Sequence, residues 1–164
     1  CADKNSLTLN VTSETPEIVL QVGEPKDLLT PAFKIDEEEL LVITHRESPL
    51  QNMNLEEVQA LFAGQGDPSM QVWVYASDED VQVLFEQAVM NGRSVSSLAK
   101  LAVSAQQMSD QLNADSHSVG ILPRHWKAGS TRDIYSIGTY PVLAITRSIP
   151  QGAVQTLITC LQGN

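Results

Sequence analysis

Basic residues are scarce in this chain, and their scarcity excludes two classes of partner. The 164 residues include 10 Lys and Arg against 20 Asp and Glu, which gives a formal net charge of −10 at pH 7. Nucleic acids and anionic lipid surfaces bind proteins through clustered positive charge. We therefore expect no nucleic-acid partner and no attachment to an anionic lipid surface through charge.

Long hydrophobic stretches and the common catalytic motifs are also missing. No apolar run approaches the roughly 18–20 residues that a transmembrane helix requires, so we expect no transmembrane segment. The sequence contains neither a Gly-x-Ser-x-Gly nucleophile elbow nor a phosphate-binding P-loop. We expect a protein without enzymatic activity and without a cofactor.

Metal-binding side chains are few and scattered. His45, His117 and His125 fall in unrelated segments, and the two cysteines, Cys1 and Cys160, stand near opposite ends of the chain. Zinc sites are built from Cys and His ligands at short, paired spacing, and no such cluster is present. We therefore expect no metal site and interpret each His as a surface or hydrogen-bonded residue.

The chain does contain enough apolar residues for a buried core, with 42% hydrophobic against 18% charged residues. Apolar runs and alternating patterns predict strands over residues 7–12, 17–22, 40–45, 71–76, 119–122, 134–137 and 142–146. Apolar residues at helical spacing predict helices over residues 55–62, 81–90, 104–113 and 150–161. This alternation is typical of an α/β protein with mainly parallel sheets, in which the apolar strand 17–22 would be central.

The helix that follows Asn54 has clear local signals. Asn54 with Glu57 three residues later matches a capping box, and Gly64 stands where a helix end favours a left-handed residue. Ser104 with Gln107 gives a similar start to another helix.

The segment Gln71–Met90 reads as a buried strand, a polar turn and an amphipathic helix, and its turn is Ser77-Asp78-Glu79-Asp80. Such junctions are where ligands usually bind in α/β proteins. The acids permit two interpretations. In the first, Ser77 caps the helix, Asp80 reaches back to it, and Asp78 and Glu79 stabilise the first turn. In the second, the acids also meet a cationic ligand or a basic partner surface.

Four segments occur in the order found in the phosphate-type substrate-binding proteins of bacterial ABC transporters. LLVITHRESPLQNMNLEEVQALFAGQ resembles that family's crossover strand and next helix, and VWVYASDEDVQVLFEQAV resembles the strand, turn and helix of its anion site. AVSAQQMSDQLNADSHSVGILP resembles its Val-x-x-Asp-Pro segment, and YPVLAITRSIPQGAVQTLITCLQ resembles its return to the first lobe and its last helix. The resemblance extends over about three quarters of the chain.

The resemblance implies an α/β, type II periplasmic-binding-protein-like fold with two small lobes. Residues 43–122 would form the second lobe, and residues 1–42 with 123–164 would form the first. The family begins with a strand, a ligand-binding turn and a long helix before the counterpart of residues 7–12. The first lobe would therefore be incomplete or reduced, either because these elements lie upstream of the chain's start or because the lobe has been pared down.

By resemblance, the protein is an extracytoplasmic solute-binding-protein-like domain, with a membrane permease or another protein as partner. The cleft positions would be Gly23, Glu24, Tyr75, Ser77, Asp78, Glu79 and Asp80. The family's Gly-Ser-Gly-Thr anion loop aligns with residues 78–81, where three acids now stand. Two like charges about 4 Å apart repel by about 4 kcal/mol at an effective dielectric constant of 20. We therefore expect that the anion site is lost and that the ligand, which the sequence does not name, is not phosphate.

Two further questions remain open at the level of sequence. The alternative function is a non-catalytic protein–protein interaction or sensory module that reuses the fold. In the family's arrangement the two ends of the chain pack on one lobe, which implies a disulfide between Cys1 and Cys160. Cys1 as a lipid-modified N-terminus, in a periplasmic or cell-surface lipoprotein, and two free thiols are the alternatives. Trp73, Tyr75 and Trp126 are interpreted as packing residues.

Overall fold

The computed structural model describes residues 1–12 and 14–163, which form two compact units. Unit 1 comprises Cys1–Glu38 with Tyr140–Asn164, and unit 2 comprises Glu39–Thr139. The strands form one sheet in the order β1-β6-β2-β5-β3-β4. The chain passes from one unit to the other within β2 (Ala32–His45) and again within β6 (Thr131–Thr146).

Residues 39–42 and 123–139 belong to unit 2, whereas the resemblance implied that they belong to the first lobe. Hydrogen bonds to neighbouring elements of unit 2 explain the difference. The Ser109 hydroxyl donates to the carbonyl of Trp126 at 2.9 Å, and the Ser130 N–H donates to Asn113 Oδ1 at 2.7 Å. The Met53 N–H donates to the carbonyl of Ile134, also at 2.9 Å.

The sheet of unit 2 is mixed, so the expectation of mainly parallel strands was wrong. β5 (Ser118–Pro123) pairs antiparallel with β2 and parallel with β3 (Gln71–Val74), which in turn pairs parallel with β4 (Lys100–Leu101). Every residue of β5 is buried. This strand lies inside the sheet with helices on both of its faces, which favours a continuous apolar run.

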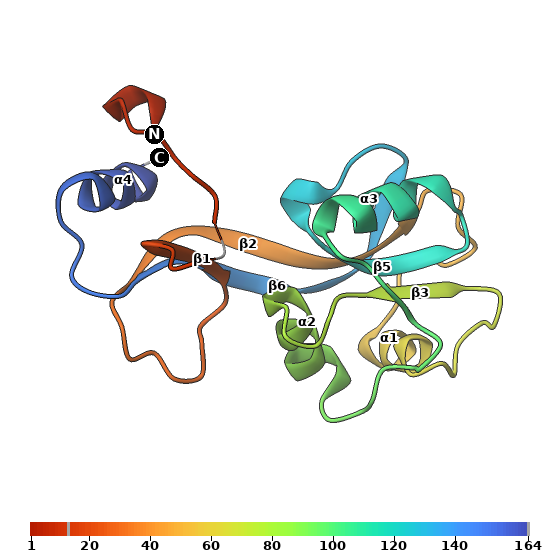
Figure 1. The fold of residues 1–164 in the computed structure, drawn as a ribbon. Coiled ribbons are helices and arrows are strands. Elements are labelled where there is room, and N and C mark those ends of the chain that lie inside the picture. The colour runs from red at the N-terminus through yellow and green to blue at the C-terminus, as the bar shows by residue number, and fades with distance from the viewer. Residues whose placement is uncertain (13, 164) are drawn as a thin grey trace. The chain divides into compact units, whose positions relative to one another are not determined.

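Three helices cover the sheet of unit 2. α1 (Leu55–Phe62) and α2 (Asp80–Phe85), which continues into a π-helical turn, η2 (Glu86–Met90), lie on one face, and α3 (Ala105–Ala114) lies on the other (Figure 1). The predicted capping box is confirmed, because Asn54 Oδ1 accepts from the Glu57 N–H at 3.0 Å and Glu57 Oε2 accepts from the Asn54 N–H at 2.7 Å. Ser104 caps α3 as expected.

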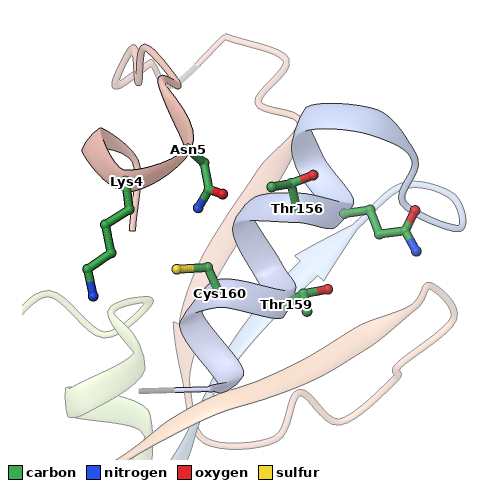
Figure 2. A pocket seen from close by; sticks show the side chains of 6 residues that line it. Lys4, Asn5, Thr156, Thr159 and Cys160 are labelled. Carbon is green, nitrogen blue, oxygen red and sulfur yellow. The ribbon is translucent and has the colours of Figure 1, made fainter.

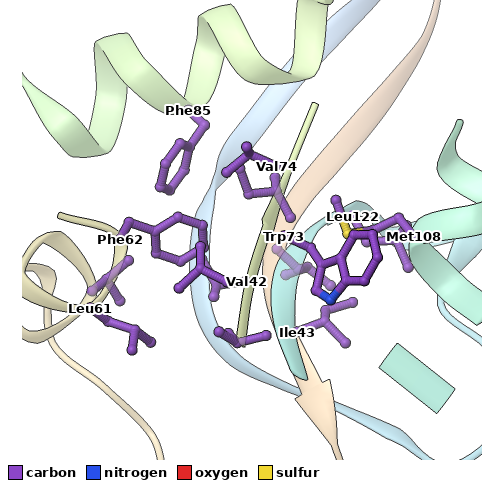
Figure 3. Close-up of a cluster of buried hydrophobic side chains, with 14 of the residues drawn as sticks. Val42, Ile43, Leu61, Phe62, Trp73, Val74, Phe85, Met108 and Leu122 are labelled. Carbon is purple, nitrogen blue, oxygen red and sulfur yellow. The ribbon is translucent and has the colours of Figure 1, made fainter. Parts of the chain in front are cut away.

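The core of unit 2 follows from the alternation of side chains along β3. Val74 points toward Phe62 and Phe85 of α1 and α2, whose ring centroids are 4.6 Å apart, whereas Trp73 points toward Met108 of α3 (Figure 3). Trp73 is therefore a packing residue, as expected. Trp126, in the 3₁₀ turn η3 (Arg124–Trp126), keeps 37% of its surface exposed and packs less tightly than expected.

Unit 1 contains the β1 (Ile18–Val22) pairing with the C-terminal half of β6, the short 3₁₀ helix η1 (Asp3–Asn5) and the terminal helix α4 (Gly152–Gln162). A disulfide joins Cys1 to Cys160, with 5.7 Å between the Cα atoms. Among the residues that the structure describes, the buried hydrophobic residues of this unit are Leu143, Ala144 and Ile158, against twenty-two in unit 2. Unit 1 therefore has very little apolar core of its own.

Three strand predictions differ from the structure. Residues 7–12 form no strand and are mostly exposed. β1 is an edge strand and not a central one, with Val19 and Leu20 47% and 62% exposed. The two strands expected at 134–137 and 142–146 form a single strand, β6, in which Gly138 has a φ of +149°, a conformation that mainly glycine adopts. Among the described residues, no helix is both long and apolar enough to cross a membrane.

Candidate functional site

Five of the seven predicted cleft residues lie between the end of β3 and the first residue of α2, and the helix begins at a different residue from the one predicted. The N-cap of α2 is Glu79 and not Ser77, and no side chain caps the helix. The backbone closes the turn instead, because the Glu79 N–H donates to the carbonyl of Ala76 at 3.1 Å and the Val83 N–H donates to the carbonyl of Glu79 at 3.0 Å. The interpretation of the acids as a capping box on Ser77 is therefore wrong.

A buried glutamine, which sequence reasoning missed, holds this turn in place. Gln82 is 2% exposed, its Oε1 accepts from the Tyr75 N–H at 3.1 Å, and its Nε2 donates to Glu86 Oε1 at 2.9 Å. Both ends of the amide are thereby satisfied, as a buried polar group requires. The hydrogen bond between Tyr75 and Gln82 fixes the end of β3 against the first turn of α2. An amide between Val81 and Val83 is the signal that could have pointed to it.

Tyr75 is the first residue after β3, and its hydroxyl has no partner. The residue is 6% exposed, and its Oη is buried without a hydrogen bond in the part of the chain that the structure describes. Burial, and secondarily the charge of Glu79, raises the pKa of Tyr75 well above its usual value. The phenol therefore stays protonated, and leaving it unsatisfied costs about 1–3 kcal/mol.

The acids of the turn point to solvent. Ser77, Asp78 and Glu79 are exposed, and neither Asp78 nor Glu79 forms an ion pair within the described residues. Asp80, which opens α2, is partly buried. Within the same residues, no group of three or more His, Cys, Asp or Glu side chains comes together in a way that could hold a metal ion. The turn is thus an acidic surface next to a buried phenol.

The other two predicted cleft residues, Gly23 and Glu24, lie in unit 1. Gly23 is buried, has a φ of +85° and donates its N–H to the carbonyl of Pro141 at 2.8 Å. Glu24, which follows it, is exposed. Because they belong to unit 1 and Tyr75–Asp80 belong to unit 2, their grouping into one cleft stays a prediction.

A shallow hollow of about 490 Å³ lies beside the disulfide in unit 1, lined by Lys4, Asn5, Gln155, Thr156, Thr159 and Cys160. Figure 2 shows these side chains on η1 and α4. The Asn5 amide donates to the carbonyl of Cys1 at 3.0 Å, and the Thr156 hydroxyl donates to the carbonyl of Gly152 at 3.0 Å. Both groups thus serve the local backbone, and Lys4 supplies the positive charge of this hollow.

A charged cluster in unit 2 was also missed from the sequence. Arg124 Nε donates to Glu39 Oε2 at 2.7 Å, and the Ser136 hydroxyl donates to Glu39 Oε1 at 2.8 Å. The hydrogen bond from Ser136, followed by that from Arg124, lowers the pKa of Glu39. The cluster ties β2, β6 and the residue after β5 together, and it forms no site for a ligand by itself.

Comparison with known proteins places the fold. No protein-family model and no curated protein sequence matches the chain. An ABC-type phosphate transport receptor from Vibrio cholerae matches with a TM-score of 0.66 at 14% identity, over 90% of this chain and 74% of that one. A protein from Clostridium perfringens described as a phosphate ABC transporter substrate-binding protein, solved with bound phosphate, matches with a TM-score of 0.77 at 11% identity, over 88% and 72%.

The regulatory domain of OxyR2 from Vibrio vulnificus, in an E204G variant, also matches, with a TM-score of 0.61 at 7% identity. The match extends over 98% of this chain and 72% of that one. Identities this low establish a shared fold and no more. The similarity to phosphate-type binding proteins that the sequence indicates is confirmed at that level. The chain has the type II periplasmic-binding-protein-like fold.

Proposed function

We propose that this chain is a non-catalytic, extracytoplasmic binding domain of the solute-binding-protein type whose ligand is not an oxyanion. The observation that carries the proposal is the β3–α2 turn, where Asp78 and Glu79 are exposed and form no ion pair with any residue that the structure describes. An oxyanion site needs inward N–H groups, hydroxyls or cations. This turn offers carboxylates instead, and the α-helix behind it is only six residues long.

Solvent weakens the repulsion between an oxyanion and these carboxylates but does not turn it into attraction. Between two unit charges 4 Å apart, repulsion is about 1 kcal/mol in bulk water and about 4 kcal/mol at an effective dielectric constant of 20. A phosphate dianion beside Asp78 and Glu79 would experience several such terms. Phosphate should therefore be rejected at this turn.

Two observations support an extracytoplasmic location and a non-catalytic role. Disulfides persist in oxidising compartments, and Cys1–Cys160 is such a bond. The similar structures are named as transport receptors, substrate-binding proteins and regulatory domains. We infer that a membrane permease or another membrane-associated protein receives the ligand or reads its binding.

A panel of solutes tests this function. Thermal unfolding would be followed with phosphate, sulfate, molybdate, amino acids, amines and divalent cations. A ligand at 100 times its Kd stabilises the folded state by about 2.7 kcal/mol, a shift of several degrees for a chain of this size. We expect a shift with at least one solute and none with phosphate. A shift with phosphate would overturn the proposal.

A second candidate is a protein–protein interaction module, and the surface of unit 1 favours it. Val11, Leu29 and Ile149 are 104%, 93% and 77% exposed, in a unit whose described residues include three buried hydrophobic side chains. We infer that these residues contribute to a contiguous apolar patch, the kind of surface that another protein covers. This candidate would be favoured if no solute in the panel shifted the melting temperature and the mass in solution rose with protein concentration.

A further inference from the structure

We propose that Asn91 is a site of spontaneous covalent modification, at which the side-chain amide loses ammonia and the residue becomes aspartate or isoaspartate. The inference does not depend on the proposed function. Asn91-Gly92 is the one place in the chain where Gly follows Asn. The structure leaves both reacting groups of this pair exposed and without hydrogen bonds among the described residues.

Asn91 and Gly92 are the two central residues of a tight turn at the end of η2. The Arg93 N–H donates to the carbonyl of Met90 at 2.9 Å, which closes the turn. Both central residues have a positive φ, +46° for Asn91 and +85° for Gly92. Positive φ at both positions characterises the type I′ turn, in which Asn-Gly is a preferred pair. The backbone conformation therefore explains why a glycine follows Asn91.

In the reaction, the backbone nitrogen of Gly92 attacks Cγ of Asn91. A new N–Cγ bond forms while the bond from Cγ to the amide nitrogen breaks. The proton of the Gly92 nitrogen leaves with that group as ammonia, and a five-membered succinimide ring remains. Water from the solvent then opens the ring at either carbonyl, which gives aspartate or isoaspartate without any oxidant or reductant. Because both groups belong to neighbouring residues, the attack is intramolecular.

The attacking nitrogen is free in the structure. The Gly92 N–H forms no hydrogen bond with any described residue, whereas the N–H groups of Asn91 and Arg93 on either side are both bonded. Apart from its chain neighbours, no heavy atom lies within 4 Å of the position where a Cβ of Gly92 would be. Rotation of the Asn91–Gly92 peptide, which brings the nitrogen toward Cγ, therefore meets little steric resistance on this side.

The side-chain amide of Asn91 is accessible as well. It is exposed and forms no hydrogen bond within the part of the chain that the structure describes. The amide of Asn113, by contrast, donates to the carbonyl of Ser109 at 2.9 Å and accepts from the Ser130 N–H at 2.7 Å. The amide of Asn54 is held in its helix cap. Those two amides would have to break hydrogen bonds before they could react.

Asn52 provides a matched comparison in the same unit. Like Asn91 it is exposed, and its side chain forms no hydrogen bond within the described residues. The next residue is Met53, however, whose N–H donates to the carbonyl of Ile134 at 2.9 Å and whose side chain packs against the core. The attacking nitrogen is therefore held in place at Asn52 and free at Asn91.

The modification would alter the end of η2. It places a carboxylate at the C-terminal end of a helical turn, where negative charge is unfavourable, and isoaspartate also adds a carbon atom to the main chain. Val89 and Met90, just before Asn91, are buried, and the carbonyl of Val89 accepts from Gln59 Nε2 at 2.6 Å. We expect the modified protein to exchange the backbone amides of η2 faster, while those of β5 keep their protection.

The test is to incubate the folded protein in mildly alkaline buffer and to map its peptides by mass spectrometry. Alkaline pH speeds the reaction because the attacking nitrogen must lose its proton. We expect the Asn91 peptide to gain the mass difference between NH2 and OH and to separate chromatographically into aspartyl and isoaspartyl forms. When half of it has converted, Asn52 and Asn113 should retain their amides.

Two variants separate the contributions. Gly92→Ala adds a methyl group beside the attacking nitrogen and should suppress the conversion. Because Ala is strained at positive φ, hydrogen exchange of residues 86–93 is followed in the same variant. A loosened turn would favour the attack, so a slower reaction cannot be attributed to it. Asn91→Asp carries the new charge on an ordinary backbone and should reproduce part of the faster exchange in η2.

Several results would overturn the inference. The first is retention of the amide at Asn91 while Asn52 converts, and the second is an unchanged rate in Gly92→Ala. Conversion to aspartate alone would also refute it, because direct hydrolysis by water does not pass through the succinimide and gives no isoaspartate. If Asn91 reacted only after the protein was unfolded in urea, the turn would be holding the two groups apart and the argument from accessibility would be wrong.

Discussion

Loss of the Cys1–Cys160 disulfide should unfold unit 1 and leave unit 2 folded. The described residues of unit 1 include three buried hydrophobic side chains, whereas unit 2 has a continuous core built around β3, β5 and three helices. Apolar burial is the main favourable term in folding, so the two units differ greatly in intrinsic stability. The covalent link must therefore carry a large share of the stability of unit 1.

The magnitude follows from the loop that the bond closes. The two cysteines are 159 residues apart in sequence, but a folded unit 2 occupies most of that loop. The chain that becomes free when unit 1 alone unfolds is then roughly 60 residues long, and the chain-entropy model gives about 4 kcal/mol for closing it. That is a large fraction of the 5–15 kcal/mol that typically stabilises a domain.

The positions of the tryptophans make the assay selective. Trp73 and Trp126 both lie in unit 2, so tryptophan fluorescence reports the unfolding of that unit. Hydrogen exchange, resolved by peptide, reports β1 and α4 of unit 1. In the Cys1→Ser/Cys160→Ser variant we expect β1 and α4 to lose protection, while the urea midpoint of fluorescence stays unchanged.

Two results would refute this reasoning. A parallel fall of the fluorescence midpoint would mean that the units unfold as one cooperative body. Unchanged protection of β1 and α4 would mean that the disulfide contributes little to unit 1. The intact mass of the wild-type protein should rise by about 2 Da on reduction, and without that rise the bond is absent from the protein under test.

Other substitutions test the packing, the charges and the caps of unit 2. A methyl group in Gly120→Ala would lie 2.5 Å from Met108 Sδ, so we expect about 1–3 kcal/mol of destabilisation in urea titrations. Asn54→Ala should cost about 1 kcal/mol by the same measurement, because it removes a helix cap. Glu39→Gln should cost about 1 kcal/mol at pH 7, and a cost above 3 kcal/mol would contradict a partly solvated pair with Arg124. The pKa of Glu39 is lower in the folded state, so its contribution is complete above pH 4.5 and is lost as the pH falls through the folded value; stability curves between pH 3 and 7 should therefore converge for wild type and variant at the acidic end.

Features that depend on neighbouring residues in sequence were predictable. The capping box of Asn54 and Glu57 and the start of α3 at Ser104 need only three or four residues to form. Gly64 has the left-handed φ of +78° that its place after α1 indicates. The order of strands and helices, and through it the fold, rests on such local patterns.

Features that depend on contacts between residues far apart in sequence could not be predicted. Residues 18–22 are apolar in either a central or an edge strand, and only the absence of a second neighbour in the sheet makes β1 an edge. The pairing of Glu39 with Arg124 and Ser136 joins residues 85 and 97 positions apart. No local pattern encodes contacts of that range.

The candidate site illustrates how both kinds of information combine. The sequence located the acids at the end of a strand, but the first interpretation placed the helix N-cap at Ser77, with Asp80 reaching back to it. In the structure, Gln82 Oε1 accepts a hydrogen bond from the Tyr75 N–H, and the carbonyl of Ala76 accepts one from the Glu79 N–H. The helix α2 therefore begins only at Asp80. Asp78 therefore stands outside the helix and Glu79 at its N-cap, where neither side chain is needed for capping. Both carboxylates are exposed, so the turn is fixed by the hydrogen bond between Gln82 and Tyr75 and not by the acids that the sequence drew attention to.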